Sequence, residues 1–147
     1  MFGPATYEHT QPGWLIRIGL GAFLIVLLIM AQTATQWLYL PGGILLICLF
    51  VFHSLCVRID DEFIHLSFGI GIIRRSIPLT RIASCQVTRT PWYFGWGIRY
   101  VFNGWMWNVS GFHSVELTYV DDGHFRIGTD EPQALEAAIN AAIAGNA

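Results

Sequence analysis

A long stretch without charge limits what this chain can fold into more than any other feature. No Asp, Glu, Lys or Arg occurs from Ile18 to Cys56. A helix needs about 20 apolar residues to cross a bilayer, and the span Trp14–Thr33 meets this length. A second apolar span runs over Trp37–Val57, after a short connection. The sequence therefore predicts two antiparallel transmembrane helices over residues 14–57.

The composition also indicates a membrane protein. Charged residues make up 12% of the chain, about half of the roughly 25% that is usual in soluble domains. The formal net charge is -2, so the chain lacks the basic balance that a nucleic-acid partner would require. We expect no nucleic-acid partner.

The positions of the arginines predict an orientation. The connection between the two spans has none, whereas Arg58, Arg74, Arg75 and Arg81 follow the second span. Basic residues are enriched on the cytoplasmic side of membrane proteins. The C-terminal part is therefore predicted to be cytoplasmic, and residues 1–13 are predicted to be a short flexible tail on the same side.

Residues 58–147 are predicted to fold as a domain of strands closed by one helix. Apolar and polar residues alternate over Ile64–Phe68 and Val115–Tyr119, as in half-buried strands. Asp122-Gly123 is a strong hairpin signal. Asp130 is the expected N-cap of a final helix. The apolar stripe of that helix has helical spacing and consists of Leu135, Ala138, Ile139, Ala142 and Ile143.

Four stretches of this region carry a resemblance to a known family. They are Val57–Phe68 (VRIDDEFIHLSF), Ile77–Ile82 (IPLTRI), Gly95–Arg99 (GWGIR) and Gly123–Leu135 (GHFRIGTDEPQAL). In them the chain resembles the bacterial PH-domain (pleckstrin-homology-like) family of small membrane proteins, over residues 56–144.

The resemblance implies an α+β membrane protein. In it, a two-helix transmembrane hairpin is followed by a PH-like antiparallel half-open barrel with a C-terminal helix. It further implies the bacterial cytoplasmic (inner) membrane, crossed more than once, with both termini cytoplasmic. The family has no generally agreed catalytic residues, so the resemblance implies none here.

The segment Pro91–Gly111 is unusually rich in aromatic residues. Aromatic rings with one polar edge favour the boundary between lipid and water. An arginine near an anionic leaflet adds about 1 kcal/mol of attraction. The candidate lipid-contact residues are Arg89, Trp92, Trp96, Arg99, Trp105 and Trp107.

The sequence does not decide between a helix and a strand for this segment. Phe94, Ile98 and Phe102 recur every four residues, as in a short helix, whereas Trp105 and Trp107 alternate as on a strand. The rings could equally fill the core of the domain or pack on the transmembrane helices.

Other reactive side chains are expected to be structural. His53 and Cys56 have the spacing of a shared helix face, but a metal site needs about four ligands. The acidic run Asp60–Glu62 is interpreted as a solvated turn, and His65 as a surface histidine. Cys48, Cys56 and Cys85 are interpreted as small buried apolar residues. We therefore expect no metal, no cofactor and no catalytic site.

The sequence thus favours a membrane-anchored binding or scaffolding module. Its expected partners are membrane lipids, copies of itself or another membrane protein. The alternative is an accessory subunit of a transporter or channel assembly, in which the hairpin packs between other helices. An enzyme is the least favoured class because no catalytic motif is evident.

Overall fold

The computed structural model describes residues 6–33, 37, 39–101 and 104–145. Within these ranges the chain is α+β. Its elements are, in order, β1 (Tyr7–Pro12), α1 (Trp14–Thr33), α2 (Tyr39–Val51), β2 (Ser54–Ile59), β3 (Phe63–Phe68), β4 (Ile73–Pro78), η2 (Leu79–Arg81), β5 (Ile82–Arg89), η3 (Trp92–Phe94), β6 (Gly97–Val101), β7 (Gly104–Asn108), β8 (His113–Tyr119), β9 (His124–Gly128) and α3 (Pro132–Gly145).

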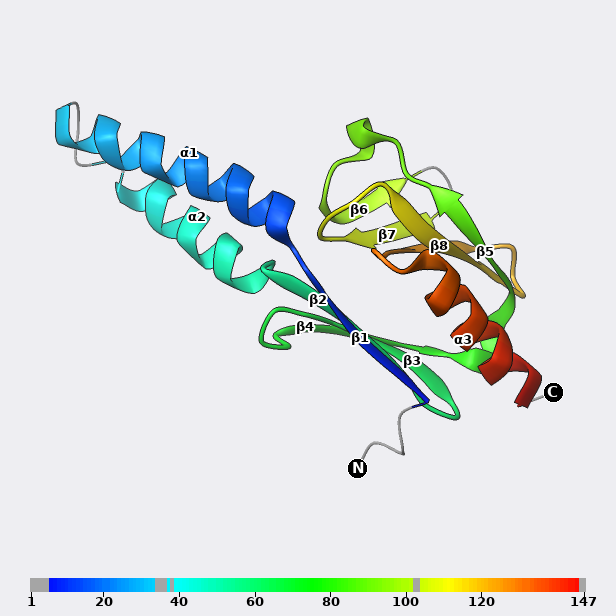
Figure 1. Cartoon of the computed structure of the whole chain (residues 1–147). Coiled ribbons are helices and arrows are strands. Elements are labelled where there is room, and N and C mark those ends of the chain that lie inside the picture. Colours follow the sequence, from blue (N-terminus) through cyan, green and yellow to red (C-terminus); the bar gives the residue numbers. More distant parts are fainter. Residues whose placement is uncertain (1–5, 34–36, 38, 102–103, 146–147) are drawn as a thin grey trace.

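The described strands form two sheets that face each other, and α3 lies along one open side between them (Figure 1). Sheet A has the order β1-β2-β3-β4 and is antiparallel throughout. Sheet B has the order β5-β8-β9-β7-β6. The antiparallel barrel that we expected is wrong in one respect, since β7 pairs with β9 in parallel. The chain reverses between β7 and β8 and again between β8 and β9, and β9 lies between the other two strands, so it runs in the same direction as β7.

The core lies between the inner faces of the two sheets. The predicted alternation of β3, β8 and β9 is confirmed, because the residues of the apolar phase are buried in one cluster. The stripe of α3 is also confirmed, with Leu135 and Ile139 fully buried. The fully buried members of this cluster contribute about 1.5–3 kcal/mol each, and those from the sheets include Leu55, Ile59, Ile64, Leu66, Phe68, Val115, Leu117, Phe125 and Ile127.

The N-terminal region is part of the domain, which corrects our prediction of a flexible tail. Residues Tyr7–Pro12 form β1 and pair with β2 in full register, Tyr7 opposite Ile59 and Pro12 opposite Ser54. The alternation was missed because two of the residues on the inner phase of β1, His9 and Gln11, are polar. Residues 1–5 lie outside the described residues.

The second apolar span is also corrected. Helix α2 ends at Val51, and Ser54–Val57 belong to strand β2. An unbroken apolar run fits a buried strand as well as a helix, and here Leu55 and Val57 are buried between the sheets. With 13 residues, α2 is about 20 Å long, which is shorter than the roughly 30 Å hydrocarbon layer.

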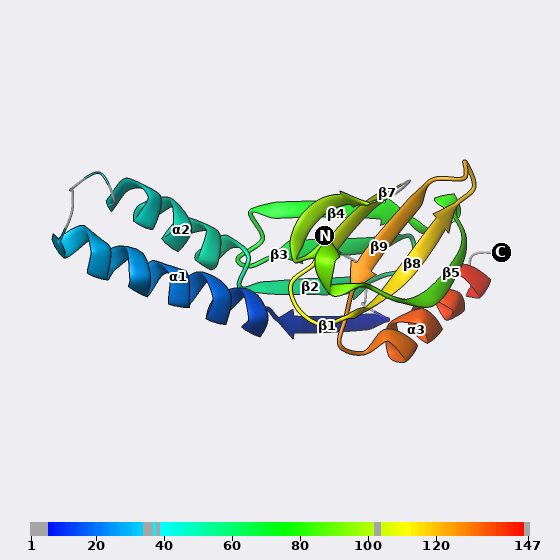
Figure 2. The same ribbon diagram turned by 90° about the horizontal axis from the view of Figure 1, so that it is seen from above.

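Helices α1 and α2 form an antiparallel hairpin that projects from one end of the domain (Figures 1 and 2). Helix α1 has 20 residues, and among the described residues its stretch Trp14–Gln32 is the one helix long and apolar enough to cross a membrane. Large apolar side chains on both helices are exposed. The hairpin is therefore an apolar projection whose surface the domain does not cover.

The aromatic segment is not a continuous helix. A 3-10 turn (η3) holds Trp92–Phe94, and the strands β6 and β7 follow and pair with each other. Trp105 and Trp107 lie on a strand, which was one of the two open readings. Phe94 and Ile98 belong to different elements, and Phe102, the third member of the helical spacing, lies outside the described residues.

The start of α3 differs from the prediction by one residue. Leu135 N donates to the carbonyl of Glu131 (3.0 Å), so Glu131 holds the N-cap position. Thr129 Oγ1 accepts from Glu131 N (3.1 Å). The predicted cap, Asp130, instead lies 2.7 Å from the His9 ring on β1, and this contact ties the first strand to the last helix.

Candidate functional site

The turn between β3 and β4 lies against the end of α2. Gly69 N donates to Ser54 O (2.8 Å). Gly69 has φ of 53°, and a Cβ there would lie 2.4 Å from Val51 O, so only glycine permits this approach. The two apolar residues at the tip of the turn, Ile70 and Ile72, are 58% and 66% exposed.

The loop between β7 and β8 lies against the start of α1. Gln11 on β1 is buried and donates to Ser110 O (2.9 Å), while Ser110 Oγ donates to Pro12 O (3.1 Å). A Cβ on Gly13 would lie 3.2 Å from Val109 Cβ. The next apolar residue of this loop, Phe112, is exposed.

The end of β5 continues the same surface. Thr90 N donates to Phe112 O (2.8 Å). Arg89, Thr90, Pro91, Trp92 and Phe112 line an open hollow of about 600 Å³. Trp92 is 74% exposed. An arginine and two aromatic rings therefore surround a solvent-accessible apolar depression.

These three segments share one end of the domain. In both views the β3–β4 turn, the β7–β8 loop and η3 lie at the end from which α1 and α2 leave (Figures 1 and 2). We call the exposed apolar residues of these segments the collar, and they are Ile70, Ile72, Trp92, Tyr93 and Phe112.

Two of the six predicted lipid-contact residues lie at this end, namely Arg89 and Trp92. Arg99 is exposed on the edge strand β6, and its Nε donates to Trp96 O (3.3 Å). Trp96 is half-buried and packs against the core. The structure does not bring these two residues into the hollow lined by Arg89 and Trp92.

The two tryptophans of β7 differ from each other. Trp107 is 5% exposed and packs against Phe68 and Phe125, with ring centroids 5.0 and 6.1 Å away. It belongs to the core and is withdrawn from the candidate lipid contacts, because the sheet opposite covers it. Trp105 is exposed and packs edge-on against Tyr100 (5.6 Å). It lies three residues along the strand from Asn108, about 10 Å further from the hairpin.

Sequence reasoning missed three members of the collar, Ile70, Ile72 and Phe112, whereas Tyr93 belongs to the aromatic segment. Ile70 and Ile72 lie in a Gly-Ile-Gly-Ile turn, where polar residues are usual. Two isoleucines in a turn were therefore a usable signal for an apolar tip. Phe112 had no comparable signal, because its exposure depends on how β7 and β8 are joined.

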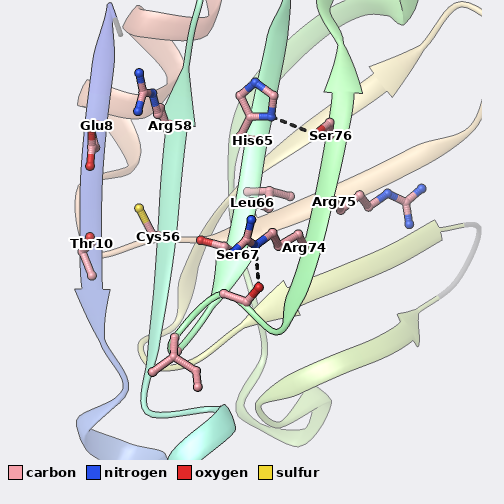
Figure 3. Close-up of a pocket in the computed structure, with 13 residues that line it drawn as sticks. Glu8, Thr10, Cys56, Arg58, His65, Leu66, Ser67, Arg74, Arg75 and Ser76 are labelled. Carbon is pink, nitrogen blue, oxygen red and sulfur yellow. Dashed lines mark hydrogen bonds between the residues drawn. The ribbon is translucent and has the colours of Figure 1, made fainter. Parts of the chain in front are cut away.

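A second feature is a groove on the outer face of sheet A (Figure 3). It has a volume of about 470 Å³ and reaches the β3–β4 turn at Gly69, Ile70 and Gly71. Two rows of side chains cross the four strands. The first row consists of Glu8, Arg58, His65 and Ser76, one residue from each strand in the order β1 to β4. The second row consists of Thr10, Cys56, Ser67 and Arg74 in the same order.

Asp60 supports one side of this groove. Its carboxylate accepts from Phe63 N (2.7 Å) and Glu62 N (3.1 Å) and lies 2.8 Å from His65 Nε2. Burial acts to raise the pKa of Asp60, but these backbone and histidine hydrogen bonds outweigh it and lower the pKa below its usual value. Asp60 is thus a buried, ionised turn residue, whereas we expected the whole acidic run to be solvated. Asp61 and Glu62 are exposed as expected.

The contacts of His65 extend this network. His65 Nδ1 lies 2.8 Å from Ser76 Oγ, so Asp60, His65 and Ser76 are connected in the order of a hydrolase triad. Acyl transfer also needs convergent N–H donors beside the nucleophile. Ser76 lies within a regular strand, where successive N–H groups point in opposite directions. We therefore interpret the chain of contacts as support for the groove.

The remaining reactive residues are separated from one another. His53 Nδ1 lies 2.7 Å from Phe50 O at the end of α2, while Cys56 is on β2, so the expected shared helix face does not exist. The three free cysteines are all half-buried. Within residues 6–33, 37, 39–101 and 104–145, no group of three His, Cys, Asp or Glu side chains could hold a metal ion.

Comparisons of the chain with protein-family models, curated proteins and solved structures found no match.

Proposed function

We propose that this chain is a membrane-anchored binding or scaffolding module. The α1–α2 hairpin inserts into the cytoplasmic membrane of a bacterium, and a PH-like domain rests on the lipid surface with both termini cytoplasmic. The observation that carries this proposal is the collar, because three separate segments place exposed apolar residues beside the base of an apolar helical hairpin.

The hairpin and the collar support each other geometrically. Helix α1 has 20 residues and is about 30 Å long, which matches the hydrocarbon layer, whereas α2, with 13 residues, spans only part of that layer beside it. Arg17, one turn into α1, donates to His53 O (3.2 Å), and its long side chain reaches back from the helix towards the headgroups, so that the start of α1 lies near their depth. With the hairpin inserted to that depth, the collar lies at the interface, where exposed tryptophan and isoleucine are favoured.

The way in which the hairpin joins the domain also supports insertion. Strands β1 and β2 are paired neighbours, and the hairpin connects them. Both ends of the hairpin therefore emerge at the same point on the domain, which places the flanking chain on one side of the bilayer. The PH-like assignment draws on the two packed sheets and α3, although the parallel β7–β9 pair departs from an antiparallel barrel.

A second candidate function is an accessory subunit of a transporter or channel assembly. A Cβ added at Gly19, Gly21 or Gly43 would meet nothing within 4 Å. Small residues with open space let another helix approach closely. In this reading the hairpin packs against helices of a partner, and the domain need not touch lipid.

The two candidates can be separated with the full chain reconstituted in vesicles. Cys48, Cys56 and Cys85 are changed to serine, and one cysteine is placed at Ile72→Cys for labelling with an environment-sensitive fluorophore. Val120→Cys is the matched control, since Val120 is 71% exposed at the opposite, β8–β9 end of the domain. Extraction at alkaline pH tests separately whether the hairpin is inserted.

A membrane-resting domain predicts blue-shifted emission at position 72 that lipid-attached quenchers reduce, with water-like emission at position 120. Water-like emission at both positions, in a chain that resists alkaline extraction, would contradict contact between the domain and lipid. The packing of the hairpin within an assembly would then be the better reading.

A further inference from the structure

The groove on the outer face of sheet A is a cationic, hydroxyl-lined depression. The described residues that line it include three arginines, Arg58, Arg74 and Arg75, and one carboxylate, Glu8. Two arginines, Arg58 and Arg74, and one carboxylate, Glu8, have side chains that face the groove, whereas Arg75 points away from it (Figure 3). With His65 neutral, the facing side chains therefore carry one net positive charge, on a chain whose net charge is -2.

The arginines of the groove have different roles. Arg75 points away from the groove (Figure 3), and its guanidinium lies 4.8 Å from the centre of the Phe125 ring. Arg74 lies back across the sheet beside Ser67 (Figure 3). Its Nε donates to Gly71 O, which fixes the guanidinium and leaves its terminal nitrogens for a ligand. Arg74 is therefore the cation best placed to bind an anion.

Hydroxyl groups complete the donor set. Thr10 and Ser67 line the same groove as Arg58 and Arg74. Ser76 also lines it, but its hydroxyl is bonded to His65 Nδ1 (2.8 Å). Guanidinium and hydroxyl donors on one concave surface suit a tetrahedral oxyanion with several acceptor oxygens, and arginine binds phosphate through parallel N–H donors. A carboxylate ligand would use fewer of these donors.

The position of the groove identifies where such a phosphate comes from. Its lower end is formed by Gly69, Ile70 and Gly71, the same turn that carries the collar residues Ile70 and Ile72. This step rests on the proposed function: when the domain contacts the membrane, this turn enters the interface, and the groove then opens at the level of the phospholipid headgroups.

We infer that the groove binds a phosphate monoester, presented by an anionic phospholipid headgroup, with Arg74 and Arg58 as the cationic ligands. The chemistry is shared by free phosphate and by soluble phosphorylated compounds, so the test must separate these sources from the lipid.

The full chain in detergent micelles is titrated calorimetrically with four probes. Short-chain phosphatidic acid presents a lipid phosphate monoester, and short-chain phosphatidylcholine is its neutral counterpart. Inorganic phosphate and glycerol 3-phosphate are the soluble probes. The test variant is Arg74→Gln. Arg81→Gln is the matched control, because Arg81 is an exposed arginine that lies outside the groove and pairs with Asp121.

Phosphatidic acid should bind, phosphatidylcholine should not, and Arg74→Gln should weaken binding roughly tenfold, the loss of one charged contact. Arg81→Gln should bind as wild type does. Inorganic phosphate or glycerol 3-phosphate binding as tightly as phosphatidic acid would keep the phosphate site but overturn its assignment to a lipid.

Absence of binding, or an equal loss in Arg74→Gln and Arg81→Gln, would overturn the site itself. Since the fluorophore at position 72 reports membrane contact independently, the groove can fail while the proposed function stands. If Arg74→Gln shifts the thermal unfolding of the chain, Ser67→Ala provides a second variant that retains the arginine and its bond to Gly71.

Discussion

The backbone N–H of Gly13 donates a 2.8 Å hydrogen bond to the carbonyl oxygen of His53. The residue that precedes α1 is therefore bonded to a residue that follows α2, and the helical hairpin is an elaborated connection between the paired strands β1 and β2. Because sheet A includes both strands, the hairpin and the domain are coupled through the backbone. Removing residues 1–57 would thus remove β1 and most of β2 together with the hairpin.

The turn that carries Ile70 and Ile72 should depend on glycine at position 69. A methyl group there would lie 2.4 Å from Val51 O, so Gly69→Ala must displace the turn or the end of α2. We expect a loss of about 1–3 kcal/mol in the free energy of unfolding, measured by thermal unfolding in detergent.

Gly97→Ala is the control for this variant. Gly97 also has a positive φ (100°), but a Cβ there meets nothing within 4 Å. A φ of 100° lies outside the left-handed region that alanine can adopt, whereas 53° lies at its edge, so Gly97→Ala gives an upper limit for the backbone cost alone. A loss below about 0.5 kcal/mol in Gly69→Ala would show that the approach to Val51 is unimportant.

Stability should fall in acid through Asp60. Its pKa is lowered in the folded state, so its stabilising effect is present above the unfolded pKa of about 3.9 and is lost as the pH falls through the folded pKa. Asp60→Asn should cost about 1–3 kcal/mol at pH 7, and the difference from wild type should shrink towards pH 3.

Denaturant unfolding at several pH values measures this effect. Asp122→Asn serves as the control, because Asp122 is an exposed turn residue with φ of 60°, a conformation that asparagine accepts readily. A difference between Asp60→Asn and wild type that is the same at pH 3 and pH 7 would contradict the role of the charge.

The two tryptophans of β7 should differ sharply in their effect on stability. Both lie on the same phase of the strand, but Trp107 packs against Phe68 and Phe125 while Trp105 is exposed. Trp107→Ala should cost about 3–5 kcal/mol, and Trp105→Ala less than about 1 kcal/mol. Similar midpoints of unfolding for the two variants would place Trp107 outside the core.

These residues show what could be predicted from the sequence. The strand over Ile64–Phe68 and the stripe of α3 were predictable because alternation marks a strand and helical spacing marks a helix. In both elements the apolar face predicted in this way packs against the core. The strand Tyr7–Pro12 was not, since its inward residues His9 and Gln11 are stabilised by Asp130 and Ser110, which are distant in sequence.

The candidate site was predicted only in part. Alternation places Trp105 and Trp107 on one face, but what covers that face depends on the opposite sheet, so their difference required tertiary structure. Arg89 and Trp92 were candidates because one flanks and the other belongs to the aromatic segment, and the structure places both at one hollow; their contact with lipid stays a prediction. The groove was not, because its two rows of side chains come from four strands whose register the sequence does not specify.

Cys85 should be a slow thiol. Burial, with a further contribution from the Glu136 carboxylate, raises the pKa of Cys85 to about 11. At pH 8 about one thiol in a thousand is then ionised, and the thiolate is the reactive form.

In a chain with Cys48→Ser and Cys56→Ser, maleimide should label Cys85 about 100-fold more slowly than it labels the same chain in denaturant. Stopped-flow or mass-spectrometric labelling measures the two rates. Equal rates in the folded and unfolded chain would show that the thiol is neither buried nor influenced by Glu136.

Glu8 should limit the affinity of the groove for phosphate. It lies directly opposite Arg58 on the neighbouring strand and on the same outer face, so its carboxylate repels an incoming anion and competes for the guanidinium. Glu8→Gln should therefore tighten binding of short-chain phosphatidic acid by roughly tenfold, about 1.4 kcal/mol, in the calorimetric titration of the full chain. Glu131→Gln removes the same charge near His9, outside the groove, and should leave the affinity unchanged. Equal tightening in both variants would mean that the ligand responds to overall charge, whereas tightening in Glu8→Gln alone would locate the phosphate beside Arg58.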